Sequence, residues 1–247
     1  MSTMVAKWPT LLTKLKSRED VAEGTMAFHF ERPASFGFTA GQFIDIDLLT
    51  PPETDAEGNT RGFSISSAPY EDTIMIATRL RDTAFKRVLK AMPFGTEVKI
   101  EGPFGNLRLH NDAKRAAIFL AGGIGITPFR SILLDATHRK LPHHIVLFFS
   151  NRRPEDAPFL HEMQALEARN ANYKFIGTMT NMDNSSEFWQ GERGFLNAQM
   201  FNRYLKTTSS PIYYIAGPPV MVNALRAVLQ KAGIDDDDIR TEEFAGY

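Results

Sequence analysis

A glycine-rich turn is the segment whose composition points most directly to chemistry. Residues 122–128 read GGIGITP and join an apolar segment to an amphipathic one. Glycines let the backbone turn sharply and approach an anion closely, and the N-terminus of a helix favours negative charge. Pro128 stands where the dinucleotide fingerprint G-x-G-x-x-G has its third glycine, although proline is well tolerated early in a helix. The run therefore predicts a phosphate-binding turn; tight strand–helix packing is the alternative.

Two further segments place cationic, polar and aromatic residues at short spacings. Residues 61–64 read RGFS, so that a cation, an aromatic ring and a hydroxyl fall at positions i, i+2 and i+3. Near the end of the chain, residues 215–219 read IAGPP, and residues 242–247 read EEFAGY. Taken by itself, RGFS is compatible with a strand that exposes one arginine, so its interpretation depends on the other segments.

Composition excludes several other kinds of chemistry. The 247 residues include 28 Lys and Arg against 29 Asp and Glu, and this net charge of −1 indicates neither a nucleic-acid nor a membrane partner. The absence of cysteine excludes disulfides, thiol nucleophiles and cysteine-bound iron–sulfur clusters on this chain. The six histidines form no H-E-x-x-H motif and no G-x-S-x-G motif occurs, so we expect neither a bound metal nor a hydrolase.

The sequence shows no segment that predicts membrane insertion or secretion. Its longest apolar stretch, residues 116–126, is far shorter than the ~20 residues of a spanning helix. The lysines near the N-terminus are not followed by the apolar region of a signal peptide. We therefore expect a cytoplasmic protein, and we expect it to be a monomer.

Up to about residue 110, the hydrophobic pattern is that of β-strands. Apolar residues alternate with polar ones over residues 26–30, 44–48 and 97–101. Successive side chains of a strand point to opposite faces, so these segments predict strands with one solvent-facing side. One amphipathic helix is predicted over residues 85–92, and Thr83 can cap it. A succession of short strands indicates an antiparallel barrel or sandwich.

Beyond residue 111, the pattern changes to alternating strands and helices. Wholly apolar segments occur at residues 116–121, 145–149 and 212–216. Each is followed by apolar residues at helical spacing, within residues 129–136, 159–166 and 221–229. Continuous apolar strands joined by amphipathic helices are typical of a parallel sheet that is covered on both faces.

Taken in chain order, these motifs resemble those of the ferredoxin–NADP reductase family of flavoproteins. Its pattern is R-x-[YF]-[ST], then G-G-x-G-x-T-P, then C-G-P, with an aromatic residue near the end, and the resemblance covers nearly the whole chain. It implies a two-domain β plus α/β fold. An antiparallel Greek-key β-barrel over residues 1–110 would bind FAD, and a parallel-sheet, Rossmann-like α/β domain over residues 111–247 would bind NAD(P).

The resemblance assigns residues of the first domain to FAD. Arg61 would bind the FAD pyrophosphate through bidentate contacts. Phe63 would stack on the flavin ring, and Ser64 would hydrogen-bond near flavin N5, where hydride arrives. The segment before the predicted helix departs from the G-x-x-[ST] turn of many relatives, but Thr83 and the helix N-terminus would still serve the FAD phosphates.

In the second domain, the resemblance assigns two groups of residues to NAD(P). Gly123, Gly125 and Thr127 of the glycine-rich turn would meet the NAD(P) phosphates. Gly217 and Pro218, which follow the last predicted apolar strand, would shape the nicotinamide pocket.

The resemblance also assigns catalytic roles near the C-terminus. Glu243 would supply a proton or orient the nicotinamide, and the terminal Tyr247 would stack over the flavin and yield to the nicotinamide. Ala216 stands where many relatives have a cysteine that contacts the nicotinamide. Because the protein's part in hydride transfer is orientation and electrostatics, this change affects rate and affinity rather than the existence of the activity.

The choice between NADP and NAD depends on the residues after the second apolar strand of this domain. An acid there binds the ribose of NAD, whereas an arginine accommodates the additional phosphate of NADP. Here Arg152 and Arg153 precede the first carboxylate, Glu155. This order favours NADPH; the alternative is an arginine at the adenosine edge, which NADH-using relatives can also carry.

The sequence thus predicts an FAD-dependent NAD(P)H oxidoreductase that passes single electrons to a ferredoxin or flavodoxin-like carrier. Residues 78–90 are strongly basic, and this basic rim would steer an acidic carrier; a solvated helix face is the alternative. Two other functions stay open. One is the reductase component of a multicomponent oxygenase, and the other is a non-catalytic flavin-binding electron-transfer subunit.

Overall fold

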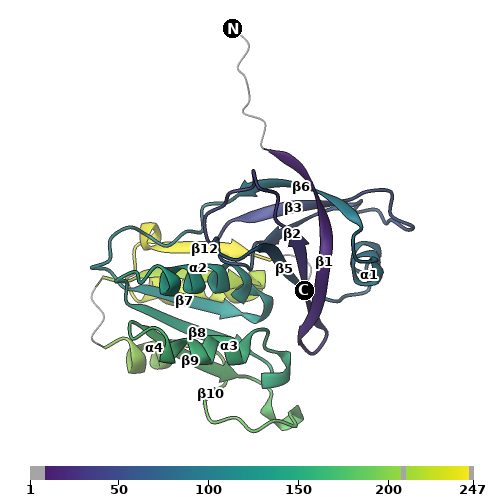
Figure 1. Cartoon of the computed structure of the whole chain (residues 1–247). Helices are drawn as coiled ribbons and strands as arrows, with labels where there is room; N and C mark the ends of the chain where they lie inside the picture. The colour runs from purple at the N-terminus through teal and green to yellow at the C-terminus, as the bar shows by residue number, and fades with distance from the viewer. Residues whose placement is uncertain (1–8, 207–209, 245–247) are drawn as a thin grey trace.

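The computed structural model describes residues 9–206 and 210–244, whose strands form two six-stranded sheets (Figure 1). In the first sheet neighbouring strands are antiparallel, in the order β4-β3-β6-β1-β2-β5. In the second they are parallel, in the order β10-β9-β8-β7-β11-β12. The predicted β plus α/β architecture is confirmed. The predicted boundary after residue 110 falls between the last strand of the first sheet and the first strand of the second.

The first sheet is curved and barrel-like. Its elements are β1 (Thr10–Ala22), β2 (Thr25–Glu31), β3 (Phe43–Leu48), β4 (Thr60–Ser64), β5 (Thr73–Arg79), α1 (Ala84–Ala91) and β6 (Glu97–Phe104). Alternation along the strands buries Phe28, Phe30, Ile44 and Ile46 in one core. Just beyond β4, Ser66 N donates to Met75 O of β5 at 2.7 Å. Within the described residues no ladder joins these two edge strands, so the predicted barrel is not closed.

The second sheet is covered by helices on both faces, as its apolar strands require. Its elements are β7 (Ala117–Gly122), α2 (Ile126–His138), β8 (Ile145–Asn151), α3 (Leu160–Ala165), β9 (Tyr173–Met179), β10 (Glu192–Arg193), α4 (Ala198–Tyr204), β11 (Ile212–Gly217), α5 (Pro219–Lys231) and β12 (Ile239–Glu243). Because β7 lies between β8 and β11, the strand order reverses there. In open α/β sheets, ligands bind at the carboxyl ends of the strands at this point.

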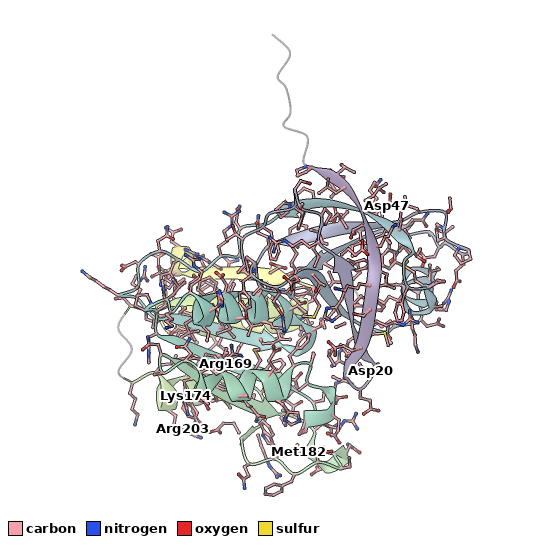
Figure 2. All side chains as sticks on the ribbon, in the orientation of Figure 1. Asp20, Asp47, Arg169, Lys174, Met182 and Arg203 are labelled. Atoms are coloured by element: carbon pink, nitrogen blue, oxygen red, sulfur yellow. The ribbon has the colours of Figure 1, made fainter. Side chains whose placement is uncertain are left out.

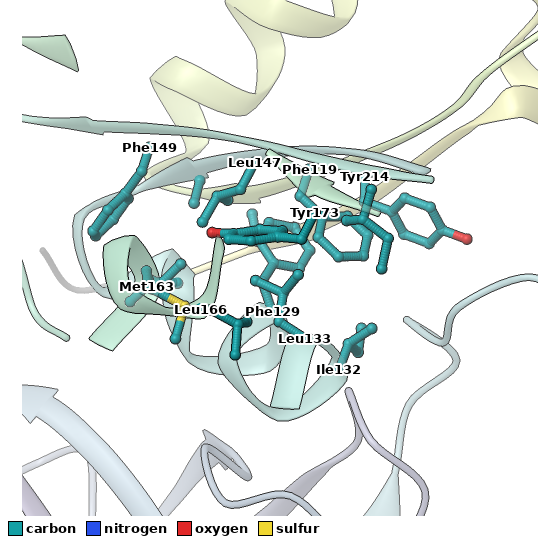
Figure 3. Packing of buried hydrophobic residues seen from close by; sticks show 14 of the residues in the cluster. Phe119, Phe129, Ile132, Leu133, Leu147, Phe149, Met163, Leu166, Tyr173 and Tyr214 are labelled. Atoms are coloured by element: carbon teal, nitrogen blue, oxygen red, sulfur yellow. The ribbon is translucent and has the colours of Figure 1, made fainter. Parts of the chain in front are cut away.

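Two apolar cores hold this sheet between its helices. On one side, α2 and α3 pack on the strands, and the Phe119 and Phe129 rings stack with centroids 4.6 Å apart (Figure 3). Tyr214 meets Phe119 edge to face at 4.9 Å. On the other side, α4 and α5 contribute Phe201 and Leu225 to a second cluster. These rigid layers fix the positions of the strand ends that carry the glycine-rich turn.

A buried arginine fastens the two domains together. Arg130 on α2 donates to the Ser66 carbonyl oxygen at 2.7 Å and contacts the carboxylates of Glu71 at 3.1 Å and Glu162 at 2.7 Å. Nearby, Ser131 Oγ donates to a first-domain carbonyl oxygen at 2.6 Å. A buried charge with its hydrogen bonds satisfied fixes orientation, because breaking one partner leaves the other uncompensated.

Many of the charged side chains lie on the surface of the molecule. Asp20, Lys174 and Arg203 are exposed on the outside of the molecule (Figure 2). No helix in the described part of the chain combines the length and the apolar character needed to cross a bilayer.

Candidate functional site

A cavity of about 350 Å³ between the domains, here the interdomain cavity, gathers the residues predicted to bind FAD. Its lining includes, from the first domain, Arg61, Phe63, Ser64, Thr83 and Lys86 and, from the second, Ile124, Thr127 and Phe244. The RGFS residues reach it because β4 is an edge strand of the first sheet. Thr127 reaches it because α2 starts directly after the glycine-rich turn.

A hydrogen bond between the domains lies at the margin of this cavity. Ser64 Oγ donates to Glu242 Oε1 at 2.8 Å, across 178 positions of sequence. Burial raises the pKa of the Glu242 carboxyl, and the bond from Ser64 acts in the opposite direction. Glu243 is exposed, because successive side chains of β12 point to opposite faces. The carboxyl that the structure brings to Ser64 is that of Glu242, whereas the predicted Glu243 lines a neighbouring cavity together with Phe63 and Ser64. Tyr247 lies outside the described residues.

Arg61, the predicted pyrophosphate ligand, is engaged by the loop that precedes it. Its Nη1 donates to three backbone carbonyl oxygens of residues 57–60 at 2.8–3.0 Å. Its Nη2 donates to the carboxylates of Glu57 at 2.8 Å and Asp55 at 3.4 Å. An anion that binds to this guanidinium must therefore exchange with the chain's own carboxylates.

The same loop also accepts a hydrogen bond from a backbone N–H group at the start of α1. Thr83 Oγ accepts a hydrogen bond from Lys86 N at 3.4 Å, as predicted for a cap, and Ala84 N donates to Asp55 Oδ2 at 3.1 Å. Lys86 lines the interdomain cavity, and burial lowers the pKa of its ammonium, with Arg81 and Arg61 adding to the effect. Sequence analysis placed Lys86 on the basic rim; its position in the first turn of a capped helix is the signal that could have placed it at this cavity.

A second cavity of about 680 Å³, here the glycine-turn cavity, lies at the carboxyl ends of β7, β8 and β11. Its lining includes Gly122, Gly123, Asn151, Arg152, Phe195, Pro218 and Val220 of the second domain and Arg79 and Arg81 of the first. It therefore occupies the point at which the strand order reverses. Gly123 lies there as predicted, whereas Thr127 faces the interdomain cavity.

The glycines of the turn permit close backbone approach. Gly123 has φ +54°, and residues Gly123–Gly125 form a 3₁₀ turn from which α2 continues. A Cβ on Gly125 would lie 2.1 Å from the carbonyl oxygen of Ala216, so the turn is pressed against β11. Thr127 Oγ donates to Ile124 O at 2.9 Å and steadies the turn. A Cβ on Gly217 would come within 3.2 Å of the Gly122 backbone.

The two arginines after β8 have different surroundings. Arg153 donates to Glu23 at 2.7 Å and to Asp156 at 2.8 Å, so its charge links the second domain to the first. Arg152 is exposed and lines the glycine-turn cavity. Of the two predicted NADP ligands, the structure brings Arg152 to the cavity and directs Arg153 away from it.

The basic residues of the predicted rim lie in different parts of the structure. Arg79 and Arg81 line the glycine-turn cavity, whereas Arg87 on the outer face of α1 pairs with Glu53 at 2.6 Å and with Asp82. Charge density in the sequence had suggested one docking surface for a carrier. Arg79, which ends β5, and Arg81, two residues further on, instead line a cavity together with residues of the second domain.

Comparison with known proteins matches a family model to the second domain and curated relatives to larger parts of the chain. Residues 119–227 match the oxidoreductase NAD-binding domain. The chain is 30% identical over 156 residues to one component of the Na⁺-translocating NADH-quinone reductase of Methylococcus capsulatus, covering 62% of this chain and 38% of that protein. It is 26% identical over 228 residues to the reductase component of phenol 2-monooxygenase from a Pseudomonas species, covering 91% and 63%. The chain thus spans less than two thirds of these relatives.

Solved structures share the fold of this chain. An Amycolatopsis cytochrome P450 reductase matches with a TM-score of 0.80 at 19% identity, over 96% of this chain and 71% of that one. A ferredoxin NADP⁺ reductase from Neisseria gonorrhoeae, solved with bound FAD and NADP, matches with a TM-score of 0.77 at 22% identity, over 95% and 98%. The chain has the two-domain fold of these reductases. The fold expected from the resemblance to the ferredoxin–NADP reductase family is thereby confirmed, and residues 119–227 match the oxidoreductase NAD-binding domain.

Proposed function

We propose that this chain is an FAD-dependent NAD(P)H oxidoreductase whose electrons pass to a separate carrier protein. The observation that carries the proposal is the Ser64–Glu242 hydrogen bond, which joins the domains at the margin of the interdomain cavity. Ser64 belongs to the RGFS segment, and Thr127 of the glycine-rich turn lines the same cavity. Nucleotides bound to the two domains would therefore bring their reactive rings together beside these residues.

The side chains that line the interdomain cavity match the chemical groups of FAD. Phe63 presents a half-buried ring, 5.7 Å from the Phe85 ring between centroids, on which a flat heterocycle would stack. Arg61, Lys86 and the N-terminus of α1 supply positive charge for a diphosphate. When bound, FAD would supply the redox chemistry, taking hydride from NAD(P)H and giving up electrons one at a time.

The chain's own part in the reaction is to orient the rings and to hold a proton. Because burial raises the pKa of Glu242, its carboxyl holds a proton closer to neutral pH than an exposed glutamate does. The Ser64 hydroxyl, 2.8 Å away, connects that carboxyl to the cavity. The glycine-rich turn, pressed against β11, leaves room for a nucleotide backbone at the carboxyl ends of the strands.

The electrons would leave to another protein because this chain lacks the means to carry them further. It contains no cysteine, and therefore no cysteine-bound iron–sulfur cluster. We propose a ferredoxin or flavodoxin-like carrier as the acceptor. The phenol monooxygenase reductase component, which aligns with 91% of this chain, favours a second candidate, in which the acceptor is an oxygenase.

Single-turnover reduction tests the role of the Ser64–Glu242 pair. With FAD-loaded protein mixed anaerobically with NADPH or NADH, Ser64→Ala and Glu242→Gln should each slow loss of the flavin's visible absorbance by roughly 100-fold. Glu31→Gln, at an exposed glutamate that ends β2, is the matched control and should keep the wild-type rate. Equal rates in all variants, or protein that binds no FAD, would contradict the proposed function.

A further inference from the structure

A further cavity of about 780 Å³, here the linker cavity, lies at the C-terminal end of α2. It is bounded by the segment that joins the two sheets, by the residues that follow α2 and by Arg240 of β12. It shares no described lining residue with the interdomain cavity or the glycine-turn cavity. Its volume is typical of small-molecule sites. Its charged and imidazole side chains are those of Arg108, His110, Asp135, Arg139, His143 and Arg240.

Positive charge predominates in the lining of the linker cavity. Arg108 is exposed, and neither Arg108 nor Arg240 forms an ion pair with a carboxylate among the described residues. The third arginine, Arg139, pairs at 3.2 Å with Asp135, the one carboxylate of the described lining. Two guanidinium groups are therefore available to an anion such as a phosphate.

A continuous series of hydrogen bonds connects these two arginines with the histidines of the lining. Arg240 Nη1 donates to Arg108 O at 2.8 Å and to Tyr214 Oη at 3.2 Å. Tyr214 Oη lies 2.9 Å from His110 Nδ1, and the His110 carbonyl oxygen accepts a bond from His143 Nε2 at 2.8 Å. Groups from distant parts of the chain are thus held in one network, and their positions relative to one another are fixed before any ligand binds.

The two histidines differ in whether both ring nitrogens have a hydrogen-bond partner. His110 uses Nδ1 with Tyr214, and its Nε2 donates to Arg115 O at 3.0 Å. His143 is only 6% exposed, yet its Nδ1 has no partner among the described residues. Because the carbonyl oxygen bonded to Nε2 can only accept, the neutral His143 ring carries its proton on Nε2, and Nδ1 is an acceptor. A buried acceptor without a donor is costly, and the hydroxyl group of a ligand would supply one.

We propose that the linker cavity binds a small phosphate monoester that carries hydroxyl groups, the chemistry shared by glycerol phosphates and sugar phosphates. Arg108 and Arg240 hold the phosphate, and a hydroxyl of the ligand donates to His143 Nδ1. Arg240 and Glu242 lie on the same face of β12, and Glu242 accepts the interdomain hydrogen bond from Ser64. A ligand on Arg240 therefore binds the strand that joins the two domains, and the cavity is placed as an effector site outside the two nucleotide cavities.

Calorimetric titration of the full chain with glycerol 3-phosphate tests this site, and we expect saturable binding of one molecule per chain. Arg108→Gln should weaken it about tenfold, because the exposed guanidinium gives charge-assisted hydrogen bonds to the phosphate. His143→Gln keeps an amide nitrogen that can donate to His110 O but removes the Nδ1 acceptor, so it should weaken binding about fivefold. Arg193→Gln is the matched control and should keep the wild-type affinity, because Arg193 is exposed on β10 at the opposite edge of the sheet from β12.

Two comparisons distinguish this site from simpler explanations. Inorganic phosphate lacks the hydroxyls of a polyol and should bind more weakly than glycerol 3-phosphate. Saturating FAD and NAD⁺ should leave glycerol 3-phosphate binding unchanged, since their proposed cavities share no described lining residue with the linker cavity. No saturable binding, equally tight binding of inorganic phosphate, displacement by either nucleotide, or unchanged affinity in Arg108→Gln or His143→Gln would overturn the proposal. None of these results depends on flavin reduction, so a failure here leaves the proposed function standing.

Discussion

The two cavities differ in what neutralises their arginines. In the interdomain cavity, Arg61 is already bound by Asp55 and Glu57 of its own loop. In the glycine-turn cavity, Arg81 and Arg152 have no carboxylate partner among the described residues. Both are proposed to bind a nucleotide diphosphate, so the first must exchange one anion for another, whereas the second presents free charge. The comparison indicates a first site whose arginine is already compensated by the chain's own carboxylates, and an open, electrostatically attractive second one.

The largest effect on stability and nucleotide affinity should come from a substitution that distorts the glycine-turn cavity and leaves the interdomain cavity intact. In Gly125→Ala, the added Cβ would meet the Ala216 carbonyl oxygen at 2.1 Å, and this contact is with backbone that cannot swing aside. We expect a loss of about 3 kcal/mol in unfolding free energy and at least a tenfold loss of nucleotide affinity, with FAD affinity retained. Thermal denaturation and separate titrations with NADP⁺ and FAD measure the three quantities.

Gly37→Ala is the control for this substitution, because nothing lies within 4 Å of the Cβ it would add. It should leave stability and both affinities unchanged. If Gly125→Ala bound NADP⁺ as well as the wild type does, the close approach of turn and strand would have no part in the second cavity.

A pH-dependent effect is expected at Glu242, where the two domains meet. Because burial raises the pKa of Glu242 in the folded state, its contribution to stability is complete at low pH and is lost as pH rises through that pKa. The uncharged Glu242→Gln should therefore gain stability relative to the wild type as pH increases. Denaturant titrations of both proteins between acidic and neutral pH measure this; a constant difference in free energy would show that the carboxyl does not titrate abnormally.

The smallest expected effect is a change in FAD affinity when one of the carboxylates that pair with Arg61 is removed. Glu57→Gln keeps the size of the side chain but removes a carboxylate that competes for Arg61. Since exposed ion pairs contribute about 0.2–1 kcal/mol, we expect FAD to bind roughly two- to fivefold tighter. Fluorescence titration of the FAD-free protein measures the affinity. Weaker binding in Glu57→Gln would mean that this carboxylate supports the cofactor instead of competing with it.

Local motifs made much of the architecture predictable from the sequence. The strand alternation, the apolar strands and the RGFS and GGIGITP segments rest on neighbours in the chain, and the structure brings Phe63, Ser64 and Thr127 to one cavity. β12 was not predicted because Ile239 is its one buried residue, so it carries no apolar pattern. Without that strand, the sequence could not show which of the two C-terminal glutamates faces Ser64.

The remaining differences come from contacts between distant segments. Arg153 pairs with Glu23, 130 positions away, and this removes it from the nucleotide cavity. Arg79 and Arg81 were interpreted by charge alone, since the sequence does not reveal that β5 ends against the second domain. The occupation of Arg61 by Asp55 and Glu57 likewise depends on how the loop folds back.

The central claim is that the two bound nucleotides meet ring to ring beside Ser64, and an isotope experiment tests it most directly. FAD-loaded protein is mixed anaerobically, without any acceptor, with NADPH that carries deuterium at the transferred C4 position or with ordinary NADPH. The account predicts that one equivalent bleaches the flavin's visible absorbance and that deuterium slows this step. Absence of bleaching, or a chain that binds no FAD, would contradict it.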